Sequence, residues 1–209
     1  MKKHILIITI LLLSITCMGV VNAYAETSED CAVPFRAGGS NRLNVQAYQQ
    51  DINDSCGPAS CRMVLNYFGI SKSEASLRTE MKKMPNKDYT HIDAVTAILN
   101  KYIAGNHYKK VFNSSEPFAN NIIENIDAGY PMICHVKTGA LPKYNNNSYY
   151  HYVVATGYTW GQGGSSGGVN TLYYNDPHYL SQYYGPATCR WDEMESAIVN
   201  FAGLYVRGR

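Results

Sequence analysis

The chain lacks an excess of charge of either sign once its first 25 residues are set aside. Lys2 and Lys3 are the only charged side chains in that segment, and the remaining residues carry 16 Lys and Arg against 16 Asp and Glu. A protein that binds nucleic acid needs basic residues gathered on one face. We therefore expect no nucleic-acid partner for this chain.

Long apolar runs are also lacking, with one exception at the start of the chain. An apolar stretch over residues 5–21 follows Lys2 and Lys3 and leads to an Ala-Tyr-Ala triplet at residues 23–25. A basic start, an apolar middle and an A-x-A end are typical of a Sec signal peptide. A membrane anchor is the alternative, but the stretch is short for a spanning helix and has no basic stop.

This segment sets the expected organisation of the chain. The signal peptide covers residues 1–25, and a single domain covers residues 26–209, which is long enough to bury a core. Lipidation at Cys17 is disfavoured because Thr16 precedes it. We expect the mature chain to be secreted to the extracellular space or cell envelope of a bacterium. We expect it there as a monomer without stable membrane insertion.

Cysteines are few, and their number in the mature chain is odd. Five remain after residue 25: Cys31, Cys56, Cys61, Cys134 and Cys189. Secreted chains tend to oxidise their thiols, so an odd number leaves at least one unpaired thiol as a candidate nucleophile. The other four allow three connectivities, and we expect Cys31 to pair with Cys189 if any pair is bridged. Buried free thiols are the alternative, because they are common in protein cores.

Common cofactor-binding spacings are missing as well. Cys134, His135 and Cys189 could form a Cys/His set, but their spacing matches no usual zinc pattern. The sequence also contains no G-x-x-x-x-G-K-[ST] phosphate-binding loop. We therefore expect neither a metal ion nor an organic cofactor.

Helical patterns come first in the chain, and strand patterns follow. Ser71 with Glu74, and Thr90 with Asp93, match the capping-box pattern before two of the helices. The second half is rich in Tyr and Val, which is typical of strands. The expected helices cover residues 56–68, 73–83, 94–102, 118–129 and 191–201, and the expected strands cover 130–137, 149–158, 169–176 and 203–207. Helices segregated from an antiparallel sheet make an α+β fold.

The stretch QQDINDSCGPASCRMVLNYFG, residues 49–69, places a cysteine at the start of a buried helix. Unpaired backbone N–H groups and the helix dipole stabilise a thiolate at such a position, so Cys56 is the candidate nucleophile. Cys61 lies on the apolar rows of the helix and is expected in the core or in a bridge. The backbone N–H of Cys56 and the side-chain amide of Gln50 would bind an oxyanion if residues 51–55 loop back beside the helix.

A thiol nucleophile needs a base that can return the proton, and a third group that orients the base. His151 lies on an expected strand, and Asp176 ends the next strand, where Pro177 forces the chain out of the sheet. The two side chains meet if the strand ends align. His135 and His178 are rival bases. No Asp-Pro strand end follows His135 closely, and His178 is expected to point away from Asp176.

A glycine-rich loop joins these two strands. Residues 160–168 read WGQGGSSGG, with five glycines among nine residues. Since His151 starts its strand and Asp176 ends the next, we expect this loop at the opposite end of the hairpin from both. The many tyrosines of the second half are expected mainly as sheet formers, with a minority lining a substrate groove.

Taken together, these stretches resemble the C39-like branch of the papain-fold cysteine peptidases. The matching text is Gln50, then DSCGPASCRMVLNYFG, GYPMICHV, HYVVATGY, YYNDPH and WDEMESAIVNFAGLYV. The resemblance implies a papain-like α+β fold with N-terminal helices packed on a C-terminal antiparallel sheet. It implies Cys56 as nucleophile and His151 as base. It also implies Asp176 as the orienting acid and Gln50 in the oxyanion hole.

The resemblance implies a secreted thiol hydrolase that cleaves peptide or amide bonds in a peptide or protein substrate. The best-known members are fused to a transporter and cut leader peptides after a Gly-Gly pair. This sequence shows no such transporter features, so we do not carry the double-glycine specificity over. Two alternatives stay open. An acyl transferase would pass the same thioester to an amine or thiol, and a catalytically silent binding module would keep only the fold.

Overall fold

The computed structural model describes residues 39–84, 91–105, 107–116, 118–161 and 169–209. The expected signal peptide, residues 1–25, and Cys31 lie outside the described residues. Within the described ranges, no helix combines the length and the apolar character that crossing a membrane requires.

The described chain has an α+β fold, as the sequence predicts. The helices are α1 (Cys56–Tyr67), α2 (Glu74–Lys82), α3 (Ile92–Tyr102), α4 (Phe118–Asp127) and α5 (Trp191–Val199). The strands are β1 (Gly39–Arg42), β2 (Lys109–Phe112), β3 (Met132–Lys137), β4 (Tyr150–Trp160), β5 (Val169–Asp176), β6 (Gly185–Cys189) and β7 (Leu204–Arg207). Short 3₁₀ turns η1 (Thr138–Ala140) and η2 (Pro142–Tyr144) join β3 to β4. Every expected helix and strand is present, and β1, β2 and β6 are additional.

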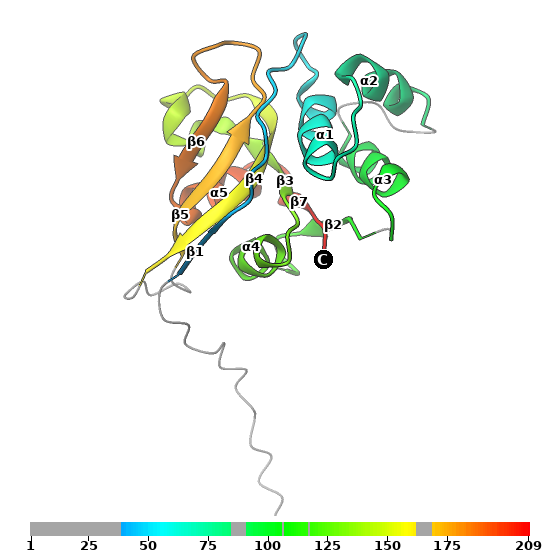
Figure 1. Cartoon of the computed structure of the whole chain (residues 1–209). Coiled ribbons are helices and arrows are strands. Elements are labelled where there is room, and N and C mark those ends of the chain that lie inside the picture. Colours follow the sequence, from blue (N-terminus) through cyan, green and yellow to red (C-terminus); the bar gives the residue numbers. More distant parts are fainter. Residues whose placement is uncertain (1–38, 85–90, 106, 117, 162–168) are drawn as a thin grey trace, which may run out of the picture. The chain divides into compact units, whose positions relative to one another are not determined.

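All the strands pair antiparallel in one twisted sheet with the order β2-β7-β3-β4-β5-β6 (Figure 1). Strand β4 is long enough to pair with β3 along its first half and with β1 along its second half. At Gly157, β4 lies close beside β1, and a Cβ atom there would lie 2.6 Å from the carbonyl oxygen of Asn41. The close approach of the two backbones therefore requires glycine at this position.

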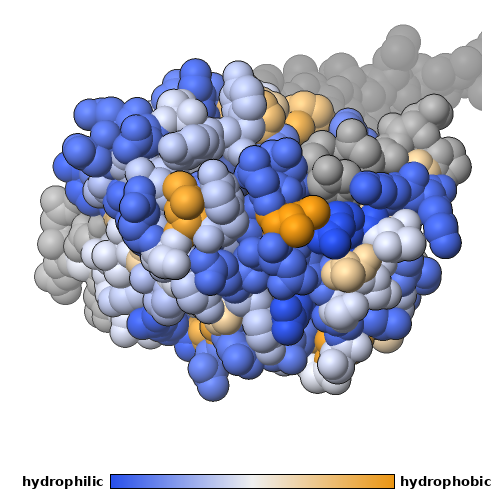
Figure 2. All heavy atoms as spheres, turned by 90° about the horizontal axis from the view of Figure 1, so that it is seen from above, coloured by the Kyte–Doolittle hydropathy of each residue, from blue (hydrophilic) through white to orange (hydrophobic). Residues whose placement is uncertain are grey.

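Helices cover both faces of the sheet. Side chains of α1, α2 and α3 pack with Ile133, Tyr152 and Val154, whereas those of α4 and α5 pack with Cys134 and Val153. Because successive side chains of a strand point to opposite faces, the two sets form separate cores on either side of the sheet. Seen from above, the surface is mostly polar, and its hydrophobic residues form small separate groups (Figure 2).

The helix starts differ in detail from the sequence pattern. The N-cap of α2 is Ser73, whose side chain accepts a hydrogen bond from the Ser76 N–H, so the expected box of Ser71 and Glu74 is wrong. The N-cap of α3 is His91, and Thr90 lies outside the described residues. Glu74 therefore does not take part in capping the helix, and its carboxylate binds another part of the chain.

The β4–β5 hairpin has the expected layout. Trp160 pairs with Val169 at one end, whereas His151 and Asp176 lie toward the other end, beyond the pair of Val154 and Asn175. The connecting loop falls mainly on residues 162–168, outside the described residues. The described strand ends therefore agree with a loop that joins the hairpin far from the candidate site.

Candidate active site

Cys56 is the first residue of α1, and its side chain is buried at 8% exposure. The N-cap residue, Ser55, makes no side-chain cap, and its carbonyl already accepts the N–H of Ala59. Pro58 has no N–H, so the first-turn donors ahead of Ala59 are the N–H groups of Cys56 and Gly57. The helix start thus presents positive partial charge beside the Cys56 sulfur.

His151 contacts both Cys56 and Asp176. One ring nitrogen, Nε2, lies 2.9 Å from Oδ1 of Asp176, and the ring is close enough to the Cys56 side chain for the two groups to act on each other's charge. Because Nε2 is engaged by the carboxylate, Nδ1 is the nitrogen left for the sulfur. The residues expected from a helix start and two strands therefore lie together in one site.

The electrostatic surroundings of His151 favour the protonated, charged form of its imidazole ring. Burial by itself would lower the pKa of His151. Interactions with Cys56 and Asp176 outweigh burial and raise that pKa to about 10. An imidazolium between two anionic partners is the arrangement expected of a thiolate–imidazolium pair.

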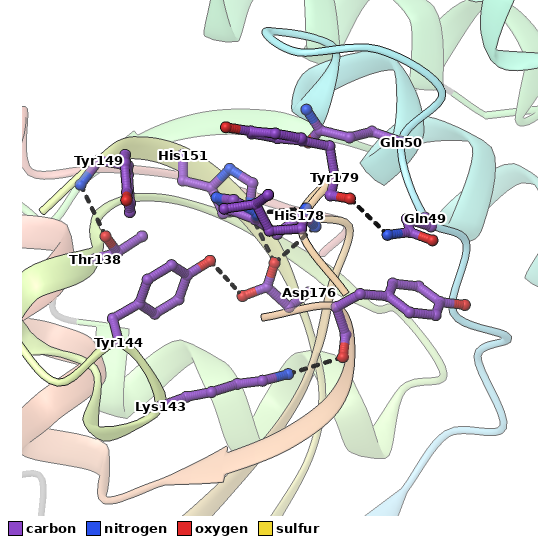
Figure 3. Close-up of polar contacts among 12 residues, drawn as sticks. Gln49, Gln50, Thr138, Lys143, Tyr144, Tyr149, His151, Asp176, His178 and Tyr179 are labelled. Atoms are coloured by element: carbon purple, nitrogen blue, oxygen red, sulfur yellow. Dashed lines mark hydrogen bonds and ion pairs between the residues drawn. The ribbon is translucent and has the colours of Figure 1, made fainter. Parts of the chain in front are cut away.

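Asp176 is fully buried and accepts two further hydrogen bonds (Figure 3). The hydroxyl of Tyr144 donates to Oδ2 at 2.7 Å, and the backbone N–H of His178 donates to Oδ1 at 2.9 Å. Both oxygens therefore have donors, which fixes the orientation of the carboxylate and compensates its burial. Sequence reasoning did not identify Tyr144 as a partner of Asp176, because it is one tyrosine among many and comes from the η2 turn rather than a strand.

Gln50 lies beside the end of β5 (Figure 3). Its backbone N–H donates to the carbonyl of Pro177 at 2.7 Å, the residue after Asp176. Its side-chain nitrogen donates to the carbonyl of Ile52 at 2.9 Å. Since an amide nitrogen carries two hydrogens, one donor remains for a ligand.

The loop between Gln50 and Cys56 is held by α2. Both carboxylate oxygens of Glu74 accept the backbone N–H of Asp51, at 3.0 and 3.1 Å. Arg78 bridges the same carboxylate to the hydroxyl of Ser55, at 3.3 and 3.1 Å. Glu74 is fully buried, and burial raises its pKa. Sequence reasoning did not predict this interaction of Glu74, because the position of Glu74 fitted a helix-capping pattern.

The two rival histidines have environments unlike that of His151. Burial lowers the pKa of His135 to about 3, and its ring stacks on Tyr152 with centroids 4.3 Å apart. Burial and the charge of His151 lower the pKa of His178 to about 4. The ring centroids of His178 and His151 are 5.2 Å apart, and the hydrogen bond of His178 to Asp176 comes from its backbone N–H. Its Nδ1 accepts the N–H of Leu180.

The remaining described cysteines are free, buried thiols. No disulfide joins Cys56, Cys61, Cys134 or Cys189, and burial raises the pKa of the last three well above that of an ordinary thiol. The alternative of buried free thiols therefore holds for the described part of the chain, and the pairing expected if any bridge forms involves Cys31, which lies outside the described residues. The same residues include no group of three or more His, Cys, Asp and Glu side chains placed to hold a metal ion.

A comparison with protein-family models places this site in a known context. The model of the Peptidase_C39 like family matches residues 42–199. The chain belongs to the Peptidase_C39 like family. The matched range runs from β1 to α5, so it includes all four candidate residues of this C39-like chain.

Solved structures share the fold of this C39-like chain at low sequence identity. A protein described as a C39-like peptidase from Bacillus anthracis is 18% identical, with a TM-score of 0.57, and the match covers 80% of this chain and 96% of that one. The peptidase domain of Streptococcus ComA, a bifunctional ABC transporter of a quorum-sensing pathway, is 20% identical, with a TM-score of 0.50 and coverages of 78% and 96%.

A third solved structure is a double glycine motif protease from an AMS/PCAT transporter, in complex with a leader peptide. It is 17% identical, and the match covers 80% of this chain and 92% of that one. Its TM-score of 0.47 is too low to support an argument about this C39-like chain. Among curated proteins, none matches the chain significantly.

Proposed function

We propose that this chain is a secreted cysteine peptidase whose nucleophile is Cys56. The observation that supports it most is the placement of Cys56, at the start of a buried helix, beside His151, which is hydrogen-bonded to Asp176 at 2.9 Å. In this proposal, His151 transfers the proton, Asp176 orients the ring, and Gln50 with the N–H of Cys56 forms the oxyanion hole. Secretion rests on the expected signal peptide at residues 1–25.

In the first step, the Cys56 thiolate attacks the carbonyl carbon of the scissile peptide bond. A C–S bond forms, and the carbonyl π electrons move to the oxygen. The resulting oxyanion accepts hydrogen bonds from the N–H of Cys56 and the free donor of Gln50. His151 then gives its proton to the amide nitrogen as the C–N bond breaks, so the amine leaves neutral and a thioester remains on Cys56.

In the second step, water hydrolyses the thioester. The neutral His151 ring takes a proton from the attacking water, a C–O bond forms, and the C–S bond breaks. The thiolate and the imidazolium are restored together, and the acid product leaves. Asp176 keeps its three hydrogen bonds, from Tyr144, from the His151 ring and from the His178 N–H, and so holds the ring in place through both steps.

The direct test uses residues 26–209 as wild type, Cys56→Ala and Cys189→Ala. Each protein is incubated with a mixture of unfolded proteins, and new N-termini are identified by mass spectrometry. We expect wild type to cleave, and Cys56→Ala to be slower by about 10⁴-fold or more, because no other group can form the thioester. Cys189→Ala removes a buried thiol from the edge strand β6 and should stay within about threefold of wild type. Wild-type rates in Cys56→Ala, or no cleavage by wild type, would contradict the proposal.

A further inference from the structure

A pocket of about 570 Å³ opens beside the candidate nucleophile. Cys56 and His151 lie in its lining, together with side chains from β3, β4, the start of α3 and the segment between α5 and β7. Ligand-binding pockets typically have volumes of about 300–1,000 Å³. The pocket is therefore large enough for a substrate side chain with part of its backbone, at a place adjoining the reacting sulfur.

One wall of this pocket is a continuous column of flat rings. Tyr150 stacks on Phe201 with centroids 4.6 Å apart, and Phe201 meets the edge of His135 at 3.9 Å. His135 in turn stacks on the buried ring of Tyr152 at 4.3 Å and an interplanar angle of 6°. All four rings line the pocket. Their mutual contacts fix each ring plane before any ligand arrives.

The outermost ring of the column is unusually accessible. Tyr150 is 69% exposed, the largest value among the described large hydrophobic residues. Its hydroxyl end can stay in water while the ring face offers an apolar surface, as is common for tyrosine at binding sites. Because Tyr150 and His151 line the same pocket, a group packed on the Tyr150 ring lies in the pocket that holds the candidate base.

The charges around the pocket do not favour an anionic ligand. His135 is neutral at physiological pH, since burial lowers its pKa to about 3, so it acts as another flat ring. Elsewhere in the lining, Ile92 is apolar, and the ammonium group of Lys110 is paired with Asp93 at 2.6 Å. Asp54 adds a carboxylate to the lining. The lining therefore suits a flat, uncharged group.

We propose that this pocket selects the substrate by binding an aromatic side chain, Phe, Tyr or Trp, within two residues of the scissile bond. The inference rests on the proposed peptidase function. Aromatic rings pair favourably with other rings in offset-stacked or edge-to-face arrangements, and the column provides both kinds of partner. A substrate with small residues at every position near the scissile bond would leave the pocket empty and be cut more slowly.

The test is cleavage-site profiling of a peptide library with wild type, Tyr150→Ala and Ala202→Phe. Wild type should show aromatic residues enriched at one position within two residues of the cut. Tyr150→Ala removes the exposed ring, and Ala202→Phe places a ring inside the pocket from an exposed lining position. Both variants should lower kcat/KM for aromatic peptides by about tenfold, and the enrichment of aromatic residues near the cut should disappear.

Phe112→Ala is the matched control, because it removes an aromatic ring that is 52% exposed and does not line the pocket. It should keep the wild-type cleavage profile. Circular dichroism of each variant checks that the fold is intact. Cleavage by wild type without aromatic enrichment, or enrichment that survives both pocket variants, overturns this inference alone. Failure of wild type to cleave any peptide overturns the proposed function instead.

Discussion

At the scale of single residues, the candidate site depends on how a buried carboxylate is held. Asp176 has no exposed surface, and its three donors come from β4, from η2 and from the chain just after β5. Its charge in turn helps to keep a proton on His151. The protonation of His151 should therefore control the alkaline side of the activity profile.

Replacing Asp176 with Asn tests this dependence. The wild-type pKa of His151 is raised to about 10, so activity should decline as the pH rises through about 10 and the ring loses its proton. Asn carries no charge, so the alkaline limb of kcat/KM should move down by at least about one pH unit. A profile of kcat/KM from pH 5 to 11 measures it. An unchanged alkaline limb would mean that Asp176 does not act on His151.

The same raised pKa affects stability. His151 has a higher pKa in the fold than its ordinary value near 6.5, so its charged contacts contribute stability that is fully present below pH 6.5. That contribution is lost as the pH rises through about 10. Wild type should therefore become less stable toward urea over this window, and His151→Ala should show a smaller change.

Tyr144→Phe tests the orientation of Asp176 separately from its charge. The variant keeps the buried ring and removes the hydroxyl that donates to Oδ2 at 2.7 Å. Leaving a buried acceptor without its donor costs about 1–3 kcal/mol. We expect kcat to fall by about tenfold with KM nearly unchanged, because Tyr144 positions Asp176 and does not touch the substrate. Tyr174→Phe is the control, since its hydroxyl is buried without a hydrogen-bond partner. Equal losses in both variants would argue against this role.

Residues with a local sequence signal were found from the sequence, and residues without one were missed. Cys56 at a helix start and Asp176 before Pro177 each stand in a recognisable local pattern. Tyr144 and Glu74 act through partners 32 and 23 residues away, and nothing in their own surroundings marks those contacts. Long-range hydrogen bonds of this kind depend on the packing of whole elements, so they become visible only in the fold.

At the scale of elements, the helices and long strands follow directly from hydrophobic periodicity. The missed strands are short: β1 is the polar GSNR, β2 is KKVF and β6 begins with Gly-Pro. Each of these segments is held extended by hydrogen bonds to a neighbouring strand. Its own sequence therefore shows little of the alternation of apolar and polar residues that predicts a strand. The contact of α2 with the loop before α1 was also unexpected, and through it α2 holds the loop that carries the proposed oxyanion donor Gln50.

Glu74→Gln tests this support. An amide can accept with only one oxygen, and its NH₂ group would face the Asp51 N–H that the carboxylate now binds with both oxygens. Hydrogen bonds to a charged group are worth about 1.5–3 kcal/mol, so the loop before Cys56 should loosen and kcat should fall about tenfold or more.

Glu80→Gln is the control for this prediction, because Glu80 lies on the same helix and pairs with Lys101 and Tyr102. It should retain wild-type kcat. If both variants lose the same activity, the effect belongs to the stability of α2 and not to the loop.

At the scale of the whole molecule, the described chain owes its stability to packing on two faces of one sheet. The four described thiols are free and sit at 0–8% exposure. A disulfide would contribute about 2–4 kcal/mol, and its reduction would lower Tm by about 5 °C or more in a chain of this size. We expect residues 26–209 to melt within about 2 °C of the same temperature with and without a reductant. A larger decrease in calorimetry would show that a bridge forms in solution.

The central claim is that Cys56 is an activated thiol paired with His151, and alkylation of the native protein tests it most directly. An ordinary free thiol is only about one per cent ionised at pH 6.5, so iodoacetamide at that pH distinguishes a thiolate held by an imidazolium. Peptide mapping should find Cys56 labelled first, while Cys61, Cys134 and Cys189 stay unlabelled. His151→Ala should slow the labelling of Cys56 at least about tenfold. Earlier labelling of another described cysteine, or Cys56 found in an intramolecular disulfide in active protein, would contradict the account.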